Sequence, residues 1–134
     1  MVILMSKLED NFLKIFRRAG VSYEREKTFP KLKNGKLRFD VWVPKYNALF
    51  EIQGEQHYKF TPYFHKTKAD FFASKLRDKK KIQFCLTNNF NLYIVPFWEI
   101  ENINTIADAF NIKYLARTVN KNEADWVRYC SQKN

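Results

Sequence analysis

Residues 38–57 read RFDVWVPKYNALFEIQGEQH and carry the strongest structural pattern in this chain of 134 residues. Apolar and polar side chains alternate through 37–43, which is typical of a β-strand with two distinct faces. A second apolar run at 48–53 follows the Pro-Lys-Tyr-Asn segment at 44–47, whose composition favours a turn. The stretch therefore predicts a β-hairpin.

A symmetric turn centred on Lys45 and Tyr46 pairs residues whose numbers sum to 91, and it places Asp40 directly opposite Glu51. Like charges opposite each other destabilise a hairpin. In a protein of net charge +10, this arrangement indicates a cation bound between the two carboxylates.

The same register puts Arg38 on the face of Asp40 and opposite Gln53. Mg²⁺ binds carboxylate and carbonyl oxygens and keeps several of its waters. Asp40, Glu51 and the Ile52 carbonyl would therefore form a magnesium site. Spacing alone supports equally an alternative in which Asp40 pairs with Arg38 or a lysine on a solvated face.

Three further residues are candidates for the same site. His57 follows the hairpin on a loop, and histidine titrates near neutral pH, so it could act as a general acid or base. Glu9 fits a capping box with Ser6 at the start of a helix, or it supplies a third carboxylate. Asp78 lies three residues before Lys81 on a predicted helix, where a solvated ion pair explains it equally well.

The 24 Lys and Arg against 14 Asp and Glu favour a polyanionic partner, most often nucleic acid. A coding bias towards Lys and Asn would raise the charge without such a partner. Basic residues concentrate at 25–38 and 59–81, on both sides of the carboxylate hairpin. The residues expected to contact nucleic acid are Lys31, Lys33, Lys36, Arg38, Lys59, Lys66, Lys68 and Lys81.

The length predicts one domain, residues 1–134. The expected elements are a helix from Ser6 to Gly20, strands at 21–29, 37–43 and 48–53, a helix at 67–87, a strand at 92–97, and short helices at 99–110 and 122–130. A strand, a helix and a strand in succession imply a right-handed crossover and a parallel pair. The fold class is α/β, an αβββαβ mixed sheet flanked by helices.

Two cysteines without Cys-x-x-Cys spacing suggest neither zinc nor a disulfide framework, so a reduced, cytoplasmic protein is expected. No apolar run approaches the ~20 residues that span a bilayer, so no membrane partner is expected. The apolar start at 1–5 is too short for a signal sequence, and we expect it to pack on the domain.

Glu9, Asp40 and the Glu51-Ile52-Gln53 run resemble the PD-(D/E)XK nuclease superfamily. More narrowly, FDVWVP at 39–44, LFEIQGEQHY at 49–58 and RDKKKIQFCLTNNFNLYIVPFWEIE at 77–101 are similar to very-short-patch repair endonucleases and related phage homing endonucleases. The likeness covers a core of about 6–101. The C-terminal helical tail, 102–134, lies outside it.

The resemblance implies a restriction-endonuclease-like fold, a phage-infected or bacterial cell, and hydrolysis of phosphodiester bonds in DNA with Mg²⁺, or with Mn²⁺ in its place. Asp40 and Glu51 would bind the metal, with Glu9 in support. His57 would transfer a proton, and Asp78 would be a helix acid close to it.

One position departs from the superfamily pattern. Gln53 stands where a lysine usually follows the glutamate by two residues, and glutamine cannot act as a cation or general acid. His57, Lys59 or Lys81 would then take over, or activity is weak or lost. The narrower repair group also lacks this lysine, which favours an active enzyme that uses His57.

Three alternatives stay open. A structure-selective nuclease, such as a Holliday-junction resolvase, would usually be a homodimer, with its apolar face at 92–97 or on the C-terminal helices. A catalytically silent DNA-binding module would explain Gln53. A nuclease acting on RNA would share the basic surface.

Overall fold

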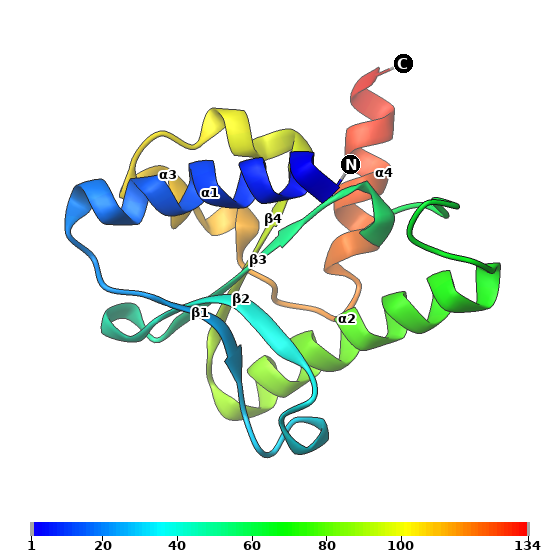
Figure 1. Ribbon diagram of the computed structural model, residues 1–134, viewed down its shortest axis with the longest axis horizontal. Coiled ribbons are helices and arrows are strands. Elements are labelled where there is room, and N and C mark those ends of the chain that lie inside the picture. Colours follow the sequence, from blue (N-terminus) through cyan, green and yellow to red (C-terminus); the bar gives the residue numbers. More distant parts are fainter. Residues whose placement is uncertain (1, 134) are drawn as a thin grey trace.

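The computed structural model describes the backbone of residues 2–133 and the side chains of residues 7–133. Its helices and strands are α1 (Val2–Ala19), β1 (Glu24–Thr28), β2 (Arg38–Val43), β3 (Ala48–Gln53), α2 (Lys68–Asn88), β4 (Asn91–Pro96), α3 (Ile106–Ala109) and α4 (Lys121–Lys133). This order confirms the predicted mixed α/β architecture (Figure 1). No helix within the described residues is both long and apolar enough to cross a membrane.

Helix α1 begins earlier than the sequence suggested. It starts at Val2, so Ser6 lies inside the helix and the predicted capping box is wrong. The Val-Ile-Leu-Met run contains no helix breaker, and each added residue extends a helix at little cost. The side chains expected to pack from 1–5 lie outside the described residues. At the other end, Gly20 adopts a φ of 69° and ends the helix as predicted.

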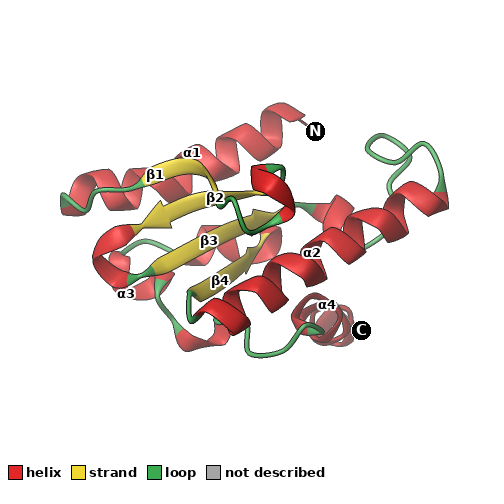
Figure 2. Ribbon diagram, turned by 90° about the horizontal axis from the view of Figure 1, so that it is seen from below, coloured by secondary structure: helices red, strands yellow, loops and turns green. Residues whose placement is uncertain are grey.

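The four strands form one sheet in the order β1-β2-β3-β4 (Figure 2). Strands β1, β2 and β3 are antiparallel neighbours, whereas β4 runs parallel to β3 after the α2 crossover. Val41 lies opposite Phe50 and Val43 opposite Ala48, so the predicted hairpin register is confirmed.

Each face of the sheet packs against a long helix. Phe12 and Phe16 of α1 contact Phe50 of β3, with ring centroids 5.1 and 5.5 Å from it. On the other face, Ile82 of α2 lies in a second buried cluster with Leu49 of β3. The three layers hold the central strands at fixed positions between α1 and α2 (Figure 2).

The alternation along β2 breaks at Asp40. Val41 and Val43 pack in the α1 cluster, but Phe39 packs in the α2 cluster, so the expectation that all three share one face is wrong. The neighbouring strand is distorted at the same level, where Glu26 has a φ of 52°. The break in alternation at Asp40 thus coincides with a local distortion of the neighbouring strand.

The edge of the sheet at β4 is covered. Tyr93 bridges to Leu115, and the Ala116 N–H donates to the Leu92 carbonyl at 2.8 Å. Leu92 and Ile94 are buried. This strand therefore does not present the apolar dimer face that the resolvase alternative placed at 92–97.

The C-terminal helix α4 packs beside α2 (Figure 2). Trp126 of α4 stacks on Tyr58 with ring centroids 5.6 Å apart. Glu123 of α4 lies 3.3 Å from Lys79 and 3.7 Å from Lys75, both on α2. The tail is thereby attached to the elements that carry the residues predicted for the site.

Replacing Phe50 by alanine tests the α1 face of the core. Phe50 is fully buried, so Phe50→Ala should lower the free energy of unfolding by about 3–5 kcal/mol. Urea denaturation followed by circular dichroism measures it. Ile112→Ala, at a side chain that is 64% exposed, is the control and should change the free energy of unfolding by less than about 1 kcal/mol. A similar small loss in both variants would contradict the packing described.

Candidate functional site

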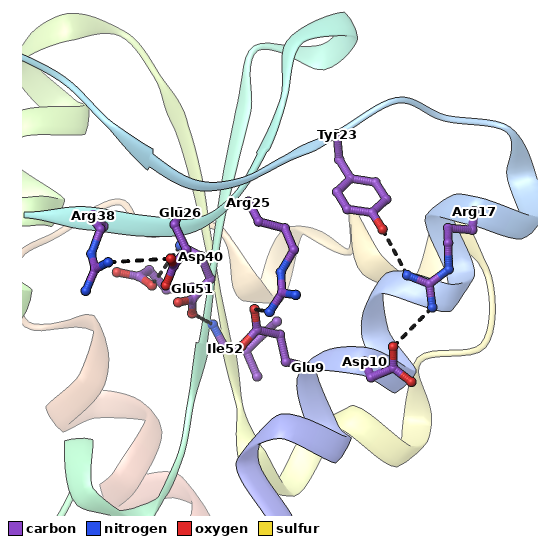
Figure 3. Close-up of polar contacts among 10 residues, drawn as sticks. All are labelled: Glu9, Asp10, Arg17, Tyr23, Arg25, Glu26, Arg38, Asp40, Glu51 and Ile52. Carbon is purple, nitrogen blue, oxygen red and sulfur yellow. Dashed lines mark hydrogen bonds and ion pairs between the residues drawn. The ribbon is translucent and has the colours of Figure 1, made fainter. Parts of the chain in front are cut away.

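Asp40 and Glu51 meet where the β2–β3 ladder ends. The last backbone pair at this end is Val41 opposite Phe50. Beyond it, the Asp40 N–H donates to Glu51 Oε2 at 3.4 Å, and the Ile52 N–H donates to Asp40 Oδ2 at 2.8 Å (Figure 3). The two carboxylates thus accept the backbone hydrogen bonds that carbonyls of the neighbouring strand would accept in a regular ladder.

Arg38 does not join this pair. The sequence placed it opposite Gln53, but the strands have diverged at that level and Gln53 instead lies beside Pro96 of β4. The Arg38 guanidinium is exposed and lies 3.4 Å from Glu26 (Figure 3). The alternative in which Arg38 neutralises Asp40 is therefore wrong.

The carboxylate pair is electrostatically costly. Desolvation, followed by the charge of the adjacent Glu51, raises the pKa of Asp40 well above its usual range. The Ile52 N–H lowers that pKa in part, and Glu9 raises it further. Two acids held this close in a partly desolvated site favour a cation beside them.

Lys81 of α2 is one such cation. Its Nζ lies 2.5 Å from Glu51 Oε1, and the two side chains are 17% and 6% exposed. Burial lowers the pKa of Lys81, but its hydrogen bond to Glu51 and the nearby acidic charges outweigh burial and raise it above the ordinary value. Lys81 is therefore directed to the carboxylates, whereas the sequence placed it among the residues that contact nucleic acid.

Gln53 is buried at 2% exposure, and its Oε1 has no hydrogen-bond partner among the described residues. It is absent from the lining of the cleft at the carboxylates. Although Gln53 was predicted as a site residue, α2 supplies the lysine at this site, and position 53 on β3 faces the interior.

His57 and Asp78 form a second polar pair. His57 Nδ1 lies 2.9 Å from Asp78 Oδ2, and Asp78 is only 5% exposed. The interpretation of Asp78 as a solvated partner of Lys81 is therefore wrong. A carboxylate only accepts, so the hydrogen of this contact belongs to Nδ1, and in a neutral imidazole Nε2 is then the acceptor.

Asn122 is a member of the site that sequence patterns do not indicate. Its Nδ2 donates to Asp78 Oδ2 at 3.3 Å from a position 44 residues further along the chain. No periodicity or motif links the two residues, and only the docking of α4 brings them together.

A single cleft collects eight of the predicted residues, two of which, Lys36 and Arg38, are basic. Its lining includes Glu9, Asp40, Glu51, His57 and Lys81, together with Ile52. Glu9 reaches it from α1, where its Oε1 lies 2.6 Å from Arg25 Nη2 (Figure 3). The helix N-cap interpretation of Glu9 is wrong, because α1 starts seven residues earlier, at Val2.

Basic side chains border the cleft. Lys36 and Arg38 line it directly. Lys33 lies against Lys80 of α2, and this side-chain contact, followed by the charges of Lys80 and Arg77, lowers the pKa of Lys33. Like charges gathered at an exposed position favour an anion there. Arg77 and Lys80 were not among the predicted contacts.

The remaining predicted basic residues lie elsewhere. Lys59 is held by Glu55, with Nζ 2.5 Å from Oε1. Lys31, Lys66 and Lys68 are exposed. These four have no direct contact with the carboxylates among the described interactions.

Within residues 7–133 there is no group of three or more His, Cys, Asp or Glu side chains arranged to hold a metal ion. Asp40 and Glu51 supply two hard oxygen donors, and after desolvation the charge of Glu51 is the next cause of the raised pKa of Asp40. This donor set fits a cation such as Mg²⁺, which retains several waters and uses one or two carboxylates.

No family model matches the chain, and no solved structure matches it. Uncharacterized protein 307L of Invertebrate iridescent virus 6 is 43% identical over 67 residues, which cover 48% of this chain and 34% of that protein. Uncharacterized protein 033L of Invertebrate iridescent virus 3 is 29% identical over 90 residues, which cover 67% of this chain and 44% of that protein. The chain thus spans less than half the length of these relatives. They come from invertebrate viruses, and the phage or bacterial setting stays a prediction.

Replacing Asp40 by asparagine tests how much the charge of this carboxylate destabilises the folded protein. A carboxyl whose pKa is raised by folding destabilises the native state once pH exceeds its unfolded pKa, and the full cost is reached above its folded pKa. Asp40→Asn keeps an acceptor for the Ile52 N–H and removes the charge. It should raise the free energy of unfolding at neutral pH, and the gain should vanish as pH falls below the ordinary carboxyl pKa of about 4.

Thermal denaturation at several pH values measures this gain. Asp10→Asn, at an exposed acid on α1, is the matched control and should give no stabilisation. A lower melting temperature for Asp40→Asn at neutral pH would show that the carboxylate stabilises the fold.

Proposed function

We propose that this chain is a Mg²⁺-dependent endonuclease that hydrolyses phosphodiester bonds in DNA and has a restriction-endonuclease-like fold. The observation that carries the proposal is the meeting of Asp40 and Glu51 at the end of the β2–β3 ladder, in a cleft that His57 also lines. The net charge of +10 supports a polyanionic substrate.

Asp40 and Glu51 would hold the metal, and Mn²⁺ could replace Mg²⁺. Bound there, the metal would supply charge stabilisation at the phosphate and activation of water. Glu9 adds negative charge at the α1 side of the cleft.

His57 is positioned to move a proton. With Nδ1–H donating to Asp78, its Nε2 accepts, which is the arrangement of a general base. A positioned base of this kind contributes about 10²–10⁴-fold to rate. Lys81 holds Glu51 and provides the positive charge that Gln53 does not.

The basic residues around the cleft would bind the phosphates on either side of the cleaved bond. Lys33 on the turn at 31–36 lies near Lys80 and Arg77 on α2, so two segments contribute positive charge here. Leu32 anchors this turn, because it is buried in the same cluster as Ile82 of α2. The position of the cations is thereby fixed relative to Lys81 and the carboxylates.

A second candidate function is a catalytically silent DNA-binding module. The observation that favours it is the contact between Lys81 and Glu51, since a lysine already neutralises one of the two acids. In that case the basic surface would bind DNA in a salt-dependent way, and titration calorimetry with Mg²⁺ or Mn²⁺ would detect no metal binding.

A Mg²⁺ cleavage panel separates these functions. Plain duplex, a T·G mismatch, a four-way junction and single-stranded DNA are incubated with the protein, and products are resolved on gels. We expect cleavage of at least one DNA substrate and a loss of at least ~10²-fold in Asp40→Asn, which removes a metal-binding charge. Asp10→Asn should cleave like the wild type.

Equal cleavage by Asp40→Asn and the wild type would contradict the assignment of the site. Absence of cleavage and of metal binding, with DNA binding retained, would favour the silent module. Cleavage confined to the four-way junction would favour a structure-selective nuclease, whose homodimeric state remains a prediction.

The salt dependence of binding tests the cation cluster. Each phosphate contact adds about 0.9 to the slope of log affinity against log salt. The Lys33→Ala, Lys80→Ala double variant should therefore reduce that slope by about 2, measured by fluorescence anisotropy with duplex DNA. Lys14→Ala on α1, where Lys14 neighbours Asp10, is the control. An unchanged slope in the double variant would exclude these lysines from the DNA contact.

A further inference from the structure

The C-terminal helix contributes a buried side chain to the candidate site. Asn122, near the start of α4, is 5% exposed, and its Nδ2 donates to Asp78 Oδ2 at 3.3 Å. His57 Nδ1 approaches the same oxygen at 2.9 Å. We propose that Asn122 is a positioning residue, which holds the Asp78 carboxylate so that His57 keeps Nδ1–H and presents Nε2 as the base. The cleavage test of this inference rests on the proposed function, whereas the test of the ring tautomer does not.

The hydrogen-bond chemistry fixes the direction of each contact. A carboxylate oxygen accepts, so both the Asn122 amide and His57 Nδ1 must donate to it. Two donors from different elements leave the Asp78 carboxylate little freedom to rotate. A partner that orients the imidazole and sets its tautomer is the usual requirement of a histidine base.

Fold stability does not account for Asn122. Its Oδ1 has no hydrogen-bond partner among the described residues, and a buried amide with unused capacity is a cost to the fold. The attachment of α4 is provided by other contacts. Trp126 stacks on Tyr58, and Glu123 reaches two lysines of α2. The contact with Asp78 is the interaction that an amide at position 122 supplies.

Two substitutions test the role. Asn122→Ala removes the donor, and Asn122→Asp keeps the shape while replacing the donor with an acceptor. Gln132→Ala, at an exposed amide on the same helix, is the control. Nitrogen NMR of the imidazole rings is tractable, because the chain has two histidines. Circular dichroism confirms that each variant is folded.

We expect the wild-type His57 ring to show one tautomer with hydrogen on Nδ1. Both Asn122 variants should lose that single-tautomer signature, and Gln132→Ala should keep it. Mg²⁺-dependent cleavage should fall about tenfold or more in both Asn122 variants, with DNA affinity unchanged, since loss of a hydrogen bond to a charged group has effects of this size.

Unchanged ring signals in a folded Asn122 variant overturn the proposal. If Asn122→Ala does not fold, the ring signals of Asn122→Asp decide whether the proposal holds. Altered ring signals with undiminished cleavage also overturn the positioning role. If the wild type does not cleave, the proposed function fails, whereas the ring signals still show whether Asn122 sets the state of His57.

Discussion

The separation of β2 from β3 beyond Val41 is the constraint on which the site depends. Two neighbouring strands that stop pairing leave backbone N–H groups without carbonyl partners, and such groups are costly when buried. Here the Asp40 and Ile52 N–H groups turn to the carboxylates of Glu51 and Asp40. The hydrogen bonds that satisfy the backbone here are therefore the same ones that place two negative charges side by side.

Two basic side chains, one on a helix and one on a strand, offset part of the negative charge at the site. Lys81 of α2 neutralises Glu51, while Arg25 of β1 pairs with Glu9 of α1 at the other side of the cleft. Asp40 is left with a raised pKa. Proteins commonly accept a local loss of stability where chemistry requires it. The remaining uncompensated charge is at Asp40, which is where the proposed function needs an oxygen ligand.

The hairpin could be predicted from sequence because its register follows from a short turn and a period-two pattern. The parallel β4 and the α2 crossover followed from connectivity. Phe39 could not be assigned correctly, because the alternation rule assumes a regular strand and the pattern of β2 breaks at Asp40. Lys81 was ambiguous for a different reason, since a lysine on a helix face has no pattern that indicates which acid it reaches. Asn122 was unpredictable because its contact depends on how the tail docks.

The docking of α4 has a consequence for the order in which the molecule is completed. During synthesis the N-terminal parts of a chain can begin to fold first. The sheet, α2 and the pair formed by His57 and Asp78 all precede Asn122 in the chain. The second hydrogen bond to Asp78, from Asn122, can form only after α4 has left the ribosome. A nascent chain would thus hold Asp40, Glu51 and the pair of His57 and Asp78 before Asn122 reaches Asp78, so the proposed site is completed last by α4.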